Sequence, residues 1–214
     1  MTRNLGDCVP ILEMLTRATR VATEHQLDAF AALYATFQGP CASAVTLLLS
    51  SGHLTCHDIA IRLPKIDAPL FCWQIDNAAP DCATLAADLT RRLTDTPWRQ
   101  TRLFWATRKA ISLVGGVSGL NRQPLQVQHD LCTTEVYLRF LERGLAQSED
   151  FWVGEDILRR EFPHLFKKKR PDAAILQKPD RPIRIIEIGG VYSADDLRHI
   201  HRSYARERIP YELW

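Results

Sequence analysis

The fold of this chain is decided by two runs near its end, RPDAAIL at residues 170–176 and IRIIEIGG at residues 183–190. Both runs are rich in apolar residues and predict buried strands joined by a short turn. Each carries one carboxylate at or near an end, Asp172 in the first and Glu187 in the second. A carboxylate in an apolar strand costs free energy unless it is paired, hydrogen-bonded or bound to a metal ion. Two such carboxylates on adjacent strands therefore predict a site for Mg²⁺ or Mn²⁺, which prefers oxygen ligands and needs only one or two from protein.

The composition is that of an ordinary globular protein. Of the 214 residues, 46% are apolar and 24% are charged, which suits one large domain or two small ones. The sequence has no apolar run of membrane-spanning length and no signal-peptide core at its start, so we expect a cytoplasmic protein without a membrane partner. The six cysteines form no C-x-x-C pair, and we expect them to stay reduced. The spacing of Cys56, His57 and Cys72 matches no zinc module.

Basic residues cluster around the two predicted strands, although the net charge is only +2. Lysine and arginine contacts to phosphates supply much of the non-specific affinity for nucleic acids. A solvated surface is the alternative explanation for a short basic run. The candidate nucleic-acid contacts near the two carboxylates are Lys167, Lys168, Lys169, Arg170, Arg198 and Arg202.

The first 78 residues predict three helices followed by a β-hairpin, the order of a winged helix-turn-helix domain. The helices span about 9–21, 23–34 and 42–51, and the hairpin strands span 54–63 and 70–73. In such a domain the third helix enters the DNA major groove and the hairpin touches the backbone, here through Arg62 and Lys65. The third helix offers serine and threonine but no Arg, Lys, Asn or Gln for base contacts, so a protein partner remains an alternative to DNA.

Residues 79–122 predict a helical connector, with helical segments over 81–93 and 97–113. The glycine-rich stretch 115–119 lacks the Gly-Lys-Ser/Thr ending of a phosphate-binding loop, and we interpret it as a domain boundary. The predicted domains are thus 1–78, 79–122 and 123–214.

The last domain predicts helix, strands, helix and strand around a mixed sheet, an α/β sandwich. Its first helix, 133–145, carries Glu135, which either favours the helix dipole or pairs with Arg139. A helix over 193–208 follows the second carboxylate, and 209–214 closes as a strand.

At this point the residues resemble a known family. Pro171-Asp172, a gap of about fifteen residues and then Glu187-Ile188-Gly189 resembles the PD-(D/E)XK nuclease fold. The chain is similar, more narrowly, to the replication-relaxation proteins of plasmids and integrated elements, which join a winged helix to a nuclease-like domain. The matching pieces are HDL at 129–131, RPDA at 170–173, IEI at 186–188 and IPYE at 209–212.

The resemblance implies that Asp172 and Glu187 bind the metal ion, with Glu135 as a possible third carboxylate. It also marks a departure, because active nucleases of this fold have a lysine where this chain has Gly189. That lysine orients the attacking water and stabilises charge on the phosphate. A cation from elsewhere can take its place, and Lys169, Arg198 and Arg202 are the candidates.

Three functions follow as hypotheses. The first is a DNA-binding protein of a mobile element, acting in replication, transfer or its regulation, with a nuclease-like domain that need not cut. The second is a DNA endonuclease that uses Asp172, Glu187 and Mg²⁺ or Mn²⁺. The third is an adaptor that binds other proteins through its winged helix.

Overall fold

Two compact units make up the protein, and each is assembled from two separate stretches of chain. Unit 1 consists of Met1–Ile61 and Trp98–Ala146, and unit 2 of Arg62–Pro97 and Gln147–Trp214. The computed structural model describes residues 4–34, 40–117, 119, 123–145, 149–166, 169–177 and 180–214. Both units combine helices with a sheet, so the predicted mixture of α and β structure is confirmed.

Unit 1 packs its helices around a three-stranded antiparallel sheet of order β1-β4-β2. Its strands are β1 (Ala22–Thr23), β2 (Leu54–Ile61) and β4 (Arg99–Ala106). Its helices are the 3-10 turn η1 (Leu5–Cys8), α1 (Val9–Glu13), the π-helical η2 (Met14–Ala18), α2 (Glu24–Leu33), α3 (Cys41–Ser50), α5 (Arg108–Val114) and α6 (Pro124–Glu142).

Local signals in the sequence determine where the helices of unit 1 begin and end. Thr23 caps α2, accepting a hydrogen bond from the Gln26 N–H at 3.1 Å while Gln26 Oε1 accepts one from the Thr23 N–H at 3.1 Å. This reciprocal pair is a capping box, which the spacing Thr-x-x-Gln at 23–26 favours. Gly52 follows α3 with φ of +73°, a left-handed conformation that favours glycine at a helix end.

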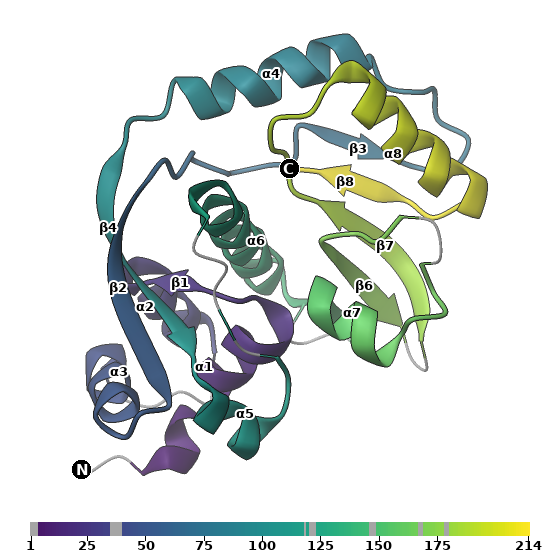
Figure 1. Cartoon of the computed structure of the whole chain (residues 1–214). Helices are drawn as coiled ribbons and strands as arrows, with labels where there is room; N and C mark the ends of the chain where they lie inside the picture. The colour runs from purple at the N-terminus through teal and green to yellow at the C-terminus, as the bar shows by residue number, and fades with distance from the viewer. Residues whose placement is uncertain are drawn as a thin grey trace. The chain divides into compact units, whose positions relative to one another are not determined.

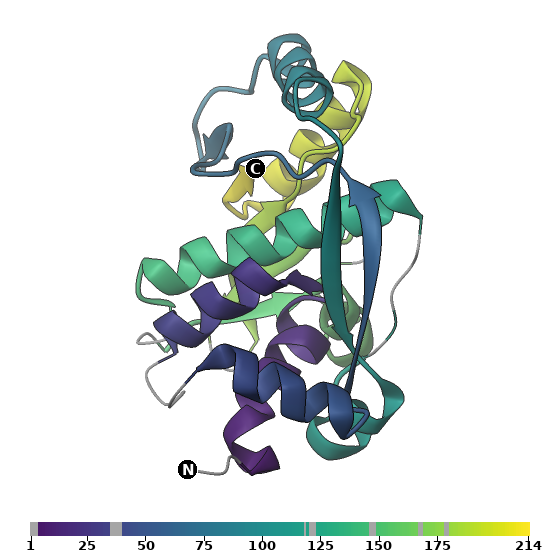
Figure 2. The ribbon, with the colours of Figure 1, turned by 90° about the vertical axis from the view of Figure 1, so that its left-hand side faces the viewer.

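The predicted hairpin between 54–63 and 70–73 is wrong. Strand β2 pairs along its whole length with β4, which the sequence analysis had taken as part of a helix, and Figure 2 shows these two strands side by side. Leu103 and Phe104 become fully or almost fully buried in this sheet, and that burial overrides the helical spacing of the local pattern. Residues 62–97 leave the sheet of unit 1 between its two long strands and belong to unit 2.

Unit 2 contains a five-stranded mixed sheet of order β3-β8-β7-β6-β5. β5, β6 and β7 form an antiparallel meander, β8 lies parallel to β7, and β3 is antiparallel to β8. The strands are β3 (Phe71–Trp73), β5 (Phe151–Gly154), β6 (Ala173–Gln177), β7 (Arg181–Glu187) and β8 (Tyr211–Leu213), and the helices are α4 (Cys82–Thr94), α7 (Glu155–Glu161) and α8 (Ala194–Glu207).

The predicted strands and the helix between them are confirmed in unit 2. β6 and β7 contain the two isoleucine-rich runs, and α8 begins at the Ser193 cap and connects β7 to the parallel strand β8 (Figure 1). The apolar stripe of α8 turns inward, with Leu197, Ile200 and Tyr204 buried. The predicted domain limits differ from the observed units, because α6 belongs to unit 1 and residues 62–97 supply β3 and α4 to unit 2.

In the part of the chain that the structure describes, no helix is long and apolar enough to cross a membrane.

Candidate active site

Asp172 and Glu187 lie at the same end of two neighbouring strands in the sheet of unit 2, β6 and β7. Ala173, the first residue of β6, pairs with Ile186 on β7, so the carboxylates sit beside each other where one strand begins and the other ends. Asp172 Oδ2 accepts a hydrogen bond of 2.7 Å from the Ile188 N–H. This bond joins the Asp172 side chain to the backbone that follows β7 and fixes it beside Glu187.

The Glu187 side chain is completely buried. Burial, followed by the nearby Asp172 charge, raises its pKa from the ordinary carboxyl value to about 7. The two carboxylates therefore repel each other in a poorly solvated place. Such a pair favours any cation that comes between them, and this fits a divalent ion that needs only one or two carboxylates.

Lys169 supplies the cation that the structure shows at this site. Its ammonium donates to Glu187 Oε2 at 3.0 Å and to the Arg170 carbonyl at 3.1 Å. A quarter of the Lys169 side chain is exposed, so the ammonium lies where the buried carboxylate meets solvent. Of the three candidate cations, Lys169 contacts Glu187, whereas Arg198 pairs with Asp195 at 2.5 Å.

A tyrosine on the buried face of α8, Tyr204, completes the surroundings of Glu187. The Tyr204 hydroxyl, on the buried face of α8, donates a hydrogen bond to Glu187 Oε1. Burial and the Glu187 charge hold the Tyr204 pKa well above its ordinary value, so this hydroxyl keeps its proton and remains a donor. The signal in the sequence was a tyrosine in an inward-facing stripe, since a buried hydroxyl usually finds a partner.

Position 189, where the resemblance implies a lysine in active nucleases, is closed by packing. A Cβ added to Gly189 would lie 2.0 Å from Leu89 Cδ2 and 2.7 Å from the Trp214 carbonyl oxygen. The Gly189 N–H also donates to that carbonyl at 2.7 Å. Helix α4 and the end of the chain thus occupy the space that a side chain would need, and the motif lysine cannot be placed there without rearrangement.

Glu135 lies on α6 in unit 1, apart from the stretches that form unit 2. It pairs with Arg139 at 2.8 Å and accepts a hydrogen bond from Gln26 at 3.2 Å. The pairing with Arg139 four residues along the helix is confirmed, and a role as a third metal ligand stays a prediction.

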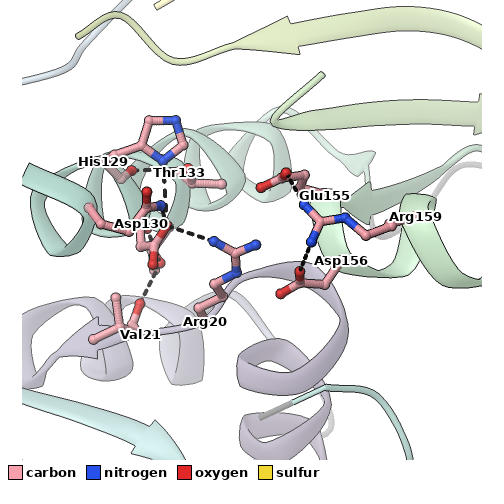
Figure 3. Close-up of polar contacts among 10 residues, drawn as sticks. Arg20, Val21, His129, Asp130, Thr133, Glu155, Asp156 and Arg159 are labelled. Carbon is pink, nitrogen blue, oxygen red and sulfur yellow. Dashed lines mark hydrogen bonds and ion pairs between the residues drawn. The ribbon is translucent and has the colours of Figure 1, made fainter. Parts of the chain in front are cut away.

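The histidine and aspartate of the HDL segment also belong to the packing of unit 1. Figure 3 shows the Arg20 guanidinium directed at the buried Asp130 carboxylate, with Arg20 Nη1 and Asp130 Oδ1 3.3 Å apart. Gln126 donates to the same Asp130 oxygen at 2.8 Å, and His129 Nδ1 lies 3.4 Å from it. The Arg20 pair ties α6 to the segment before β1, and the other two contacts lie within α6.

The acidic segment at the start of α7 is likewise paired within its own unit. Figure 3 shows the Arg159 guanidinium directed at Glu155 and Asp156, at 2.6 Å and 4.0 Å. These carboxylates stabilise the first turn of α7 through pairs with a residue three or four positions later.

The basic residues predicted to contact nucleic acid and described by the structure all belong to unit 2, and some already have other contacts. Arg62 donates to the Leu93 and Thr94 carbonyls at the end of α4, at 3.2 and 3.3 Å. Lys65 pairs with Asp67 at 2.8 Å on the surface. Arg170 and Arg202 are exposed. Lys167 and Lys168 lie outside the described residues.

Among the residues that the structure describes, no group of three or more His, Cys, Asp or Glu side chains is arranged to hold a metal ion. The six cysteines are thiols and none forms a disulfide. Asp172 and Glu187 therefore stand as a two-carboxylate site with a lysine beside it. Comparisons with models of known protein families, with curated proteins and with solved structures give no match.

Closure of position 189 predicts a difference between two adjacent glycines. Gly189→Ala should destabilise the protein by about 1–3 kcal/mol, because an inserted methyl group must displace Leu89 or the end of the chain. Gly190→Ala is the matched control, since a Cβ there meets nothing within 4 Å. Urea unfolding followed by tryptophan fluorescence measures both, and equal stabilities would contradict the observed packing.

The raised pKa of Glu187 predicts a pH-dependent stability. Between pH 4.5 and about 7 the folded protein holds a proton that the unfolded chain has released, so the free energy of unfolding falls as pH rises through this window. Glu187→Gln should remove this loss, and the exposed Glu149→Gln should keep it. Denaturant unfolding of the three proteins at pH 5 and pH 8 tests the expectation. A wild type and a Glu187→Gln variant with the same pH dependence would refute it.

Proposed function

We propose that this protein binds DNA and that unit 2 cuts its phosphodiester backbone with the help of Mg²⁺ or Mn²⁺. The observation that carries the proposal is the convergence of Asp172, Glu187 and Lys169 at one end of the inner strands β6 and β7. Two carboxylates can bind a divalent ion that acts as a Lewis acid, and a lysine can stabilise negative charge on a phosphate.

The chain's own residues have distinct roles in this proposal. Asp172 and Glu187 would hold the divalent ion, which when bound would supply Lewis acidity and lower the pKa of its water. Lys169, at the solvent side of Glu187, orients the attacking water and stabilises negative charge that develops on the phosphate. Tyr204 acts through Glu187, because its hydrogen bond fixes the orientation of one carboxylate oxygen. Asp172 is held in turn by the Ile188 N–H.

The topology of unit 2 supports the resemblance to the PD-(D/E)XK fold. An antiparallel meander of β5, β6 and β7 is followed by α8 and by β8 parallel to β7. Asp172 directly precedes β6, and Glu187 is the last residue of the neighbouring strand β7. Lys169, from the segment before β6, then takes the role of the motif lysine, whose position is occupied by Gly189 in this chain.

The topology of unit 1 supports a winged helix-turn-helix domain, with a wing different from the predicted one. The order α1, β1, α2, α3, β2, β4 with a β1-β4-β2 sheet places two long strands after the helix pair. The wing strands are then β2 and β4, and residues 62–97 are an insertion between them. Joined to a nuclease-like unit, this arrangement favours a replication-relaxation type protein of a mobile element.

Cleavage of supercoiled plasmid DNA with Mn²⁺ tests the proposal. Asp172→Asn and Lys169→Met should each lower the rate about 100-fold or more, because one removes a metal ligand and the other a charge that stabilises the transition state. Asp180→Asn and Lys109→Met are matched controls, one a carboxylate paired with His164 and the other a lysine of unit 1 bound to the Ser51 carbonyl.

Unchanged cleavage by Asp172→Asn and Lys169→Met would overturn the endonuclease assignment. DNA binding without cutting is the second candidate function, favoured by the exposed Arg170 and Arg202. Gel-shift binding to duplex DNA that weakens with salt, in a wild type that does not cleave, would support that function alone.

A further inference from the structure

Unit 1 contains a pocket between its helix pair and its sheet, lined by both apolar and polar side chains. The pocket has a volume of about 180 Å³ and lies between α2, α3 and the strands β2 and β4. Its apolar lining is contributed by Leu27, Val45, Leu49, Cys56 and Phe104. A preformed pocket with apolar side chains in its lining accepts one anchoring side chain of a partner.

The surroundings of this pocket are acidic. Glu24 and Asp28 on α2 belong to its lining, as does Arg102 on β4. Glu24 and Arg102 also line an adjoining open groove of about 570 Å³, together with Asp58 and Gln100. Arg102 pairs with Asp58 at 3.2 Å, and both side chains are more than half exposed. Three carboxylates and one guanidinium leave a net charge of −2 on the combined lining.

This face is poorly suited to nucleic acid. The exposed side chains of α3 beside it are Ala42, Ser43, Thr46 and Ser50, which carry no charge. A phosphate backbone laid on the pocket would meet Glu24 and Asp28, and like charges brought together weaken binding. The basic residues considered for DNA contact belong to unit 2.

We propose that the pocket and groove of unit 1 bind a basic amphipathic segment of a partner protein. An apolar side chain of that segment fills the pocket, and flanking lysines or arginines pair with Glu24 and Asp28. Charge complementarity identifies the partner as basic, and the apolar lining requires an aliphatic or aromatic anchor beside the charges. This inference is independent of whether unit 2 binds or cuts DNA.

A synthetic helical peptide with leucines on one face and lysines on the other is the probe, labelled with a fluorophore and titrated with the full chain. Two control peptides carry glutamate in place of lysine or serine in place of leucine. Fluorescence anisotropy should show saturable, salt-sensitive binding of the leucine-lysine peptide, at least about tenfold tighter than that of either control.

Variants then place the binding on the pocket. Glu24→Lys/Asp28→Lys should weaken binding about tenfold or more through charge repulsion, and Thr46→Phe should do so by filling the pocket mouth from the exposed face of α3. Asp67→Lys/Glu149→Lys is the matched control, because it makes the same change in net charge on exposed residues of unit 2. Circular dichroism checks that each variant is folded.

Equal peptide affinity for the wild type, the charge-reversal pair and Thr46→Phe would overturn the proposal. Equal binding of all three peptides would also overturn it. If Thr46→Phe abolished binding to duplex DNA and left the peptide affinity unchanged, the face would belong to DNA and the proposal would be wrong.

Discussion

The burial of a single carboxylate, that of Glu187, is the constraint on which the arrangement of unit 2 depends. A completely buried acid is tolerated only where hydrogen bonds and charges compensate its lost hydration. Lys169 and Tyr204 each bind one of its oxygens. The strand β7, the helix α8 and the segment before β6 are thereby held around the Glu187 carboxylate. An apolar side chain at this position would cost less free energy of burial if the core had only a structural role.

Residues 62–97 explain why position 189 has no room for a side chain. They leave unit 1 between β2 and β4 and contribute β3 and α4 to unit 2. Leu89 of α4 then packs so close to Gly189 that a side chain at that position is excluded. The cation that contacts Glu187 is Lys169, eighteen residues earlier in the chain, because the start of β6 lies beside the end of β7 in an antiparallel pair.

Sequence patterns were reliable where structure is local. The isoleucine-rich strands, the cap of α2 by Thr23 and the start of α8 at Ser193 depend on neighbouring residues, and all were predicted. The partner of β2 could not be predicted in this way. Two plausible strands follow it, and the one that pairs, β4, is 38 residues beyond the end of β2, with a spacing of apolar residues that also suits a helix.

The candidate site was predictable in its carboxylates and not in its supporting groups. Asp172 and Glu187 stand out in the sequence because a carboxylate in or beside an apolar strand needs a hydrogen-bond partner, a cation or a metal ion. Lys169 was one cation among three, and Tyr204 was one of several inward residues of α8. Only the three-dimensional arrangement shows that both reach Glu187.

Soaking Mn²⁺ into crystals of the full chain tests the central claim most directly, with anomalous scattering to locate the metal. We predict one Mn²⁺ in contact with carboxylate oxygens of both Asp172 and Glu187, and no metal there in crystals of Asp172→Asn. A wild-type crystal that shows no Mn²⁺ between these residues, with Lys169 still bound to Glu187, would contradict it.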